Sequence, residues 1–229
     1  MTRVVVVGER GDVTQTVTVG PAVLIRSQTW DDLSRLTEIV SAAGLEAVAL
    51  DPRSSAREVA ELDCWILSDL PFAAAAASGL YARLVDPAAA AGVLMLGGAM
   101  SFAGQHGVAG WSGAESERLW PVIVGTADDA IEAPDGLRLR ATADCPYRLA
   151  AVLQSAPPVF GYNAVRARPE AAVIAEFEGI GPAIVTMERD GRSRAVFASD
   201  LMPHWGAAMA AWDGLPSLVN GLVRLVVRS

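Results

Sequence analysis

The chain has 229 residues, of which 52% are hydrophobic, and its formal net charge is −8. A chain of this length and apolar content can bury a full core, which argues against disorder, and no uncharged apolar run is long enough for a membrane span. An acidic chain without a basic stripe is a poor nucleic-acid binder, and the absence of lysine excludes Schiff-base chemistry.

The first half of the chain alternates apolar runs with segments of helical spacing. We expect strands at Arg3–Val7, Glu46–Leu50, Cys64–Leu67 and Val93–Leu96. The segment Val17–Ile25 is either loop or a further strand. Helices are expected at Trp30–Ala43, from Ser54 or Ser55 to Leu62, and from Pro71 to about Val85. This alternation predicts a doubly wound, mostly parallel α/β sheet, and right-handed crossovers place the carboxyl ends of its strands at one edge.

The stretch Val93–Gly107 is the predicted centre of the site. Its short apolar strand stops at the glycine pair Gly97-Gly98, after which small and polar residues follow. Glycine allows a positive φ angle and a close approach of other groups to the backbone. Because ligands of open α/β sheets bind at the carboxyl ends of the strands, we expect this turn to form the floor of a pocket.

The second half of the chain is predicted to be richer in strands. A helical turn is expected at Glu115–Trp120, a short strand at Pro121–Val124, exposed loop and turn over Asp128–Arg140, and a short apolar segment at Leu149–Leu153. Strands are expected at Ala172–Phe177, Ala183–Glu188 and Arg194–Ala198, with a hairpin turn at Arg189–Arg192 and a closing helix at Leu215–Val227. With no internal repeat or linker, residues 1–229 are expected to form one domain.

Several segments together resemble a known family, and two of them are specific. The segments are Val7-Gly8-Glu9, Ile66-Leu67-Ser68-Asp69, Gly97-Gly98-x-x-Ser101-Phe102-x-Gly104, Leu119-Trp120-Pro121-Val122, Gly161-Tyr162-Asn163 and Ser199-Asp200-x-x-Pro203-His204-Trp205-Gly206. Their order and spacing resemble the putative glutamine amidotransferase family of the class I glutamine amidotransferase-like superfamily, which is related to trehalose-utilisation-like proteins. The segments that contain Ser101 and His204 are the specific ones.

The resemblance implies a flavodoxin-like core with a β-rich C-terminal portion and a closing helix. It also implies a site at the crest of the sheet, between the turn after the fourth strand and the loop that carries His204. True class I glutaminases carry a nucleophilic cysteine in a Gly-x-Cys-x-Gly turn, whereas this turn offers Ala99 or Met100. Cys64 and Cys145 lie far from it in sequence, so the usual thioester route is not expected.

Ser101, His204 and Asp200 are candidates for catalysis, and the first two have a structural alternative. Ser101 is the hydroxyl closest to the turn; it is either a nucleophile that needs a histidine base or a cap of the following turn. His204 is either a general base, supported by the nearby Asp200, or a structural residue whose ring bonds to the backbone.

Further residues are candidate ligand contacts at the same crest. Besides the two glycines of the turn, they are Gln105, His106, Glu9, Asp69, Tyr162, Asn163 and Trp205. The two acids could instead bind helix N-terminal N–H groups, and Asn163 could instead shape a turn. Histidine and carboxylate ligands suit zinc or iron, but no ligand spacing supports a metal site, and none is expected.

Two functional hypotheses remain open at this point. The first is an enzyme-like pocket that binds or transforms a small polar metabolite, with no cofactor and no conventional glutaminase triad. The second is a non-catalytic binding or assembly protein on the same fold. We expect a cytoplasmic location and consider a homo-oligomer, because the late strands offer an edge for pairing.

Overall fold

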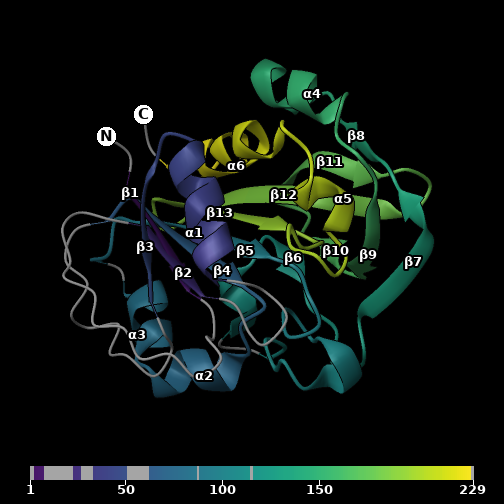
Figure 1. Ribbon diagram of the computed structural model, residues 1–229. Helices are drawn as coiled ribbons and strands as arrows, with labels where there is room; N and C mark the ends of the chain where they lie inside the picture. Colours follow the sequence, from purple (N-terminus) through teal and green to yellow (C-terminus); the bar gives the residue numbers. More distant parts are fainter. Residues whose placement is uncertain are drawn as a thin grey trace.

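The computed structural model describes residues 3–7, 23–26, 33–50, 62–86, 88–113 and 116–227 (Figure 1). Its centre is a mixed sheet whose order from the middle outward is β4-β5-β13-β12-β11-β8. The strands β1, β2 and β3 lie at the other end of the sheet, where β1 and β2 run parallel to β4. Within the described ranges, no helix is long and apolar enough to cross a membrane.

The parallel part of the sheet follows the predicted alternation of strand and helix. Its strands are β1 at Arg3–Val7, β2 at Val23–Arg26, β3 at Glu46–Ala49, β4 at Cys64–Ser68 and β5 at Gly92–Leu96. Every residue of β4 and β5 is buried, as expected for strands that are covered on both faces. The expected helix between Ser54 and Leu62 lies almost entirely outside the described residues.

The late strands extend the same sheet in an antiparallel arrangement. They are β8 at Leu139–Ala141, β11 at Ala172–Phe177, β12 at Gly181–Arg189 and β13 at Arg192–Phe197, and only β13 runs parallel to its neighbour β5. The predicted hairpin joins β12 to β13 through Asp190 and Gly191, whose φ angles of 52° and 70° suit its tight turn. Of these late strands, β11, β12 and β13 were predicted, whereas β8 lies mostly in the segment that was expected to be loop and turn.

Helices cover both faces of the sheet, because successive strand residues point in opposite directions. One face of β5 packs under α1 at Leu33–Ala42 and α6 at Leu215–Arg224, with α4 at Tyr147–Leu153 beyond them (Figure 1). The other face packs on α2 at Phe72–Ala77 and α3 at Leu80–Val85. On β5, Leu94 and Leu96 enter the first core, whereas Val93 and Met95 enter the second.

Two sequence expectations are corrected by the structure. Residues 128–140 were expected to be loop, but β7 occupies Ala130–Leu137 and pairs with β9 at Val159–Asn163 in a separate two-stranded ribbon. Half of the β7 residues are exposed and none is buried, so its sequence lacks the apolar alternation that identifies a half-buried strand. The expected single helix from Pro71 to Val85 is divided at Gly79, which takes a φ of 75°.

Smaller elements complete the chain between these units. Short 3-10 helices occur at Gln105–Gly107 and Ser116–Leu119. The strands β6 at Val122–Ile123 and β10 at Arg166–Ala167 pair with each other. The short helix α5 occupies Ala207–Ala210. The closing helix ends three residues earlier than expected, at Arg224.

The packing of α6 makes a stability prediction. Leu222 on α6 is fully buried in the core between this helix and the sheet, so Leu222→Ala should lower the free energy of unfolding by about 2–5 kcal/mol. Ser217→Ala on the exposed side of the same helix is the matched control and should change it by less than about 0.5 kcal/mol. Equal effects of the two changes in chemical denaturation would contradict this packing.

Candidate functional site

The site is built where β4, β5 and β13 end at the same edge of the sheet. Gly97 follows β5, and its N–H donates to the carbonyl oxygens of Phe197 and Ser199, each at 2.8 Å. Gly98 takes a φ of 145°, and a Cβ atom on it would collide with the Asp69 carboxylate. The glycine pair is therefore required both by backbone conformation and by close approach.

A buried amide and a buried carboxylate hold this turn. The Gly98 N–H donates to Asn163 Oδ1 at 2.9 Å, and Asn163 Nδ2 donates to the Gly98 carbonyl at 3.1 Å and to Asp129 Oδ1 at 2.9 Å. Asp129 also accepts the N–H groups of Ala103 and Gly104, at 2.9 Å and 2.8 Å. Burial raises the pKa of Asp129, although these three donors oppose the rise.

Two further buried carboxyl groups, Asp69 and Asp200, follow β4 and β13. Asp69 accepts the Met100 N–H, and burial raises its pKa to about 6. Asp200 accepts the N–H groups of Met202, Trp205 and Gly206 at 3.1, 3.3 and 2.7 Å. Burial raises the pKa of Asp200 to about 7, against the lowering effect of its N–H donors, and the charge of Asp69 adds to the rise.

These two acids line a pocket of about 200 Å³ with a histidine at its wall. The other lining residues are Ala99, Gln105, Asp128, Ala130, Glu132, His204 and Trp205. His204 Nε2 lies 3.5 Å from Glu132 Oε1, and its ring stacks on Trp205 at a centroid distance of 5.6 Å. The Trp205 indole N–H also donates to Glu132 Oε1, at 2.9 Å. The pocket therefore combines a histidine–carboxylate contact with two buried acids.

Backbone hydrogen bonds and close packing against β9 hold Trp205 in this position. Its N–H group bonds to Asp200 at one end, and its carbonyl accepts the Phe160 N–H at 2.8 Å on β9. A Cβ atom at Gly161 would overlap the indole ring, so this position admits only glycine without a shift of the tryptophan. The Gly161-Tyr162-Asn163 segment is thus a support for the pocket.

The remaining candidates take different positions. Ser101 is fully buried, and its hydroxyl donates to the Leu96 carbonyl at 2.7 Å, five residues earlier in the chain. His106 is exposed and lies 3.5 Å from Asp128, with its ring nitrogen Nδ1 nearest. Tyr162 points to another cavity and packs against Phe177. Glu9 lies outside the described residues.

The cysteines stand apart from the pocket. Cys64 is fully buried in β4, and burial raises the pKa of its thiol well above the ordinary value. Burial also raises the pKa of Cys145, which precedes α4. Since the thiolate is the reactive form, neither environment activates a nucleophile. In the part of the chain that the structure describes, no group of three histidine, cysteine or acidic residues is placed to hold a metal ion.

Sequence reasoning missed Asp129 and Glu132. Both lie in the segment that was expected to be an exposed loop, and their roles arise from the pairing of β7 with β9. The sequence signal was weak, because an acidic pair and an isolated glutamate in a polar stretch are typical of surface loops.

Comparisons with known proteins give a family and two structural neighbours. A family model described as putative glutamine amidotransferase matches residues 79–227. The cytoplasmic protein STM1381 from Salmonella typhimurium LT2 is 22% identical, with a TM-score of 0.74 over 86% of this chain and 88% of that one. The cytoplasmic protein STM3548 from Salmonella typhimurium is 24% identical, with a TM-score of 0.72 over 85% and 87%. No curated protein sequence matches this chain.

The raised pKa of Asp69 predicts a pH dependence of stability. The folded protein binds a proton at Asp69 more tightly than the unfolded chain does, so this contribution is present below pH 3.8 and is lost as the pH rises through about 6. Relative to Asp69→Asn, the wild-type free energy of unfolding should therefore fall by up to about 3 kcal/mol between pH 4 and pH 7.

Chemical denaturation across this pH range checks the prediction. Asp135→Asn, which removes an exposed carboxylate from β7, is the matched control and should show a smaller pH-dependent difference. A wild-type advantage over Asp69→Asn that grows with rising pH would contradict the assigned direction.

Proposed function

Because the chain belongs to the putative glutamine amidotransferase family, we propose that its crest pocket binds a small polar metabolite and transforms it by proton transfer, without a cysteine nucleophile. The observation that carries the proposal is the pocket itself. Two buried acids with raised pKa values line it, together with a histidine in contact with a carboxylate. Acids and bases with perturbed pKa values in a concave site are typical of catalytic centres.

The turn after β5 supports a route that avoids a thioester. Ala99 lies at the position expected for a nucleophile, and a methyl side chain cannot attack an amide. A thioester mechanism also needs backbone N–H groups free to bind an oxyanion. The Met100 N–H in this turn already donates to the Asp69 carboxylate, so an acid occupies that donor.

His204 is the proposed general acid and base. Its ring is fixed by stacking on Trp205 and by the Glu132 carboxylate, 3.5 Å from Nε2. A histidine ring held in this way can accept a proton from a ligand and return it. With pKa values of about 6 and 7, Asp69 and Asp200 can retain a proton close to neutrality and supply a second acidic group.

The size and charge of the pocket limit its ligand. A volume of about 200 Å³ is below the range of drug-sized sites, so the ligand is small. Four of the lining residues carry carboxyl groups, namely Asp69, Asp128, Glu132 and Asp200. Such a wall favours a neutral or cationic molecule that presents hydroxyl, amide or amine donors.

One observation favours the alternative of a non-catalytic binding protein. The Asp200 carboxylate accepts three N–H groups of its own loop, so its role as a structural clamp would explain its burial without any chemistry. The two functions differ in turnover: a binding protein holds its ligand unchanged. A single flavodoxin-like domain and a cytoplasmic location are part of the same proposal.

The proposal predicts that the wild-type protein releases no ammonia from glutamine. Cys64→Ala and Cys145→Ser should leave this result unchanged, because neither thiol is activated. A coupled ammonia assay, validated with a known glutaminase, checks the prediction. Glutamine-dependent ammonia that disappears in either cysteine variant would contradict it.

A second prediction concerns binding and turnover of small polyols, amines and amides. A compound that enters the pocket should raise the melting temperature of the wild type, and Ala99→Leu should weaken its binding at least tenfold by filling the cavity. Ala127→Leu on the exposed loop is the matched control.

His204→Gln should then retain binding but lower turnover by about 10² or more, as measured by NMR of the reaction mixture. Undiminished turnover in His204→Gln would contradict the role of the histidine. Binding without any turnover by the wild type would favour the binding protein.

A further inference from the structure

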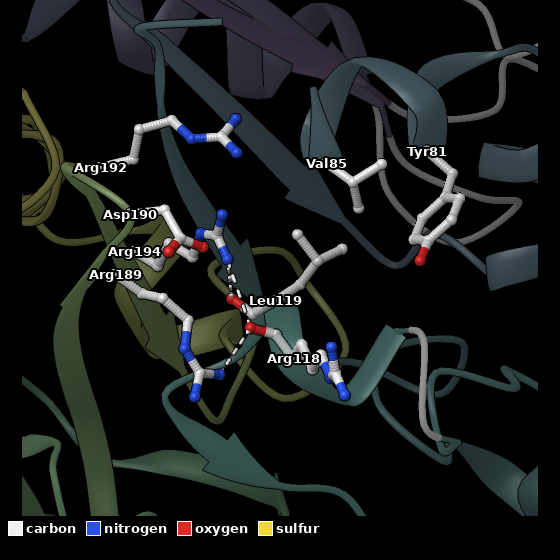
Figure 2. A pocket seen from close by; sticks show the side chains of 8 residues that line it. All are labelled: Tyr81, Val85, Arg118, Leu119, Arg189, Asp190, Arg192 and Arg194. Atoms are coloured by element: carbon white, nitrogen blue, oxygen red, sulfur yellow. Dashed lines mark hydrogen bonds between the residues drawn. The ribbon is translucent and has the colours of Figure 1, made fainter. Parts of the chain in front are cut away.

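A second and larger cavity lies at the opposite end of β13 from the crest pocket. It has a volume of about 890 Å³. Figure 2 shows side chains from the β12–β13 hairpin on one side, from α3 on another, and from the 3-10 turn at Ser116–Leu119 below them. Four of its lining residues are arginines, at positions 118, 189, 192 and 194. The crest pocket, by contrast, is lined by acids, so the two sites select for different ligands.

Two of these arginines are buried beneath the cavity wall. Arg192 and Arg194 are 5% and 3% exposed. Arg192 Nη1 donates to the Leu84 carbonyl at 3.1 Å, and Arg194 Nη1 donates to the carbonyls of Arg118 and Leu119 at 3.3 and 3.4 Å. The Nε atom of each is buried, and the described part of the chain gives it no hydrogen-bond partner. Among the described residues, each guanidinium group therefore has one buried N–H donor without an acceptor.

The positive charge at this cavity is poorly compensated. Among the described residues, neither Arg192 nor Arg194 forms a salt bridge, and Asp190 is the single acidic residue that lines the cavity. Burial and the charge of Arg192 lower the pKa of Arg194 to about 10, which Asp190 only partly opposes. Arg189 contacts Glu170 at 3.6 Å and donates to the Arg118 carbonyl at 3.1 Å.

A purely structural role does not account for this arrangement. Bonds to the Leu84 and Leu119 carbonyls tie α3 and the 3-10 turn to β13, but uncharged side chains could fill the same space. Buried charges without a counter-ion carry a desolvation cost that well-packed apolar residues avoid. An anion that enters the cavity would supply the negative charge that its described lining residues lack.

We propose that this cavity is a binding site for a small phosphorylated metabolite. A planar guanidinium presents paired donors that match phosphate oxygens, and several of them together favour a multiply charged anion over a single carboxylate. Tyr81 and Val85 of α3 form the less polar wall opposite the arginines (Figure 2). The ligand therefore combines a phosphoryl group with an organic part, and the volume suits a molecule of nucleotide size.

The test measures binding of inorganic phosphate, pyrophosphate, AMP and adenosine to the full-length protein by calorimetry at constant ionic strength. We expect AMP to bind more tightly than inorganic phosphate, and adenosine not to bind. If inorganic phosphate binds as tightly as AMP, the cavity does not recognise the organic part of the ligand and the proposal fails. If none of the three phosphate probes binds, the site itself is wrong.

Charge variants make the test specific to the cavity. Arg118→Ala, which removes an exposed guanidinium, and Arg192→Gln should each weaken AMP binding about tenfold or more. Asp190→Asn should strengthen it, because it removes the acid from the lining. Arg140→Ala, on the distant β8 and paired with Glu176, is the matched control and should leave affinity unchanged. AMP binding that is insensitive to Arg118→Ala and Asp190→Asn would overturn the proposal even if Arg192→Gln fails to fold.

Discussion

The crest of the sheet depends on one buried cluster, in which Asp129 and Asn163 hold the loop after β5. Asp129 accepts two backbone N–H groups of this loop and one from the Asn163 amide, while Asn163 exchanges two hydrogen bonds with Gly98. An unpaired buried donor costs free energy, so these bonds fix the loop in one conformation. Asn163 is the last residue of β9 and Asp129 directly precedes β7, so the β7–β9 ribbon and its entry act as a scaffold for the turn.

Once the turn is fixed, the chemistry of the pocket follows from burial. The Gly98 position brings the backbone against Asp69, and Asp200 closes its own loop through three N–H groups. Both carboxyl groups are removed from water and keep their protons to unusually high pH. The same constraint that shapes the loop thus prepares the acids beside His204.

The sequence was sufficient to predict the buried strands of the parallel part of the sheet, because such strands read as short apolar runs and end at one edge. Gly97, Asp69 and His204 could be located in this way. Residues 128–140 could not, since β7 has no buried residue and its strand conformation depends on pairing with a distant segment. Asp129 and Glu132 consequently escaped notice, and the bond from Ser101 to the Leu96 carbonyl became visible only in three dimensions.

The central claim is that Asp69 and Asp200 form an interacting pair of buried acids at the pocket. Carbon-13 NMR of the aspartate side-chain carboxyl groups tests it directly, with resonances assigned through Asp69→Asn and Asp200→Asn. We expect two groups that titrate near pH 6 and 7, and a lower midpoint for Asp200 once the charge of Asp69 is removed. Midpoints near the ordinary aspartate pKa of about 4 for both groups would contradict it.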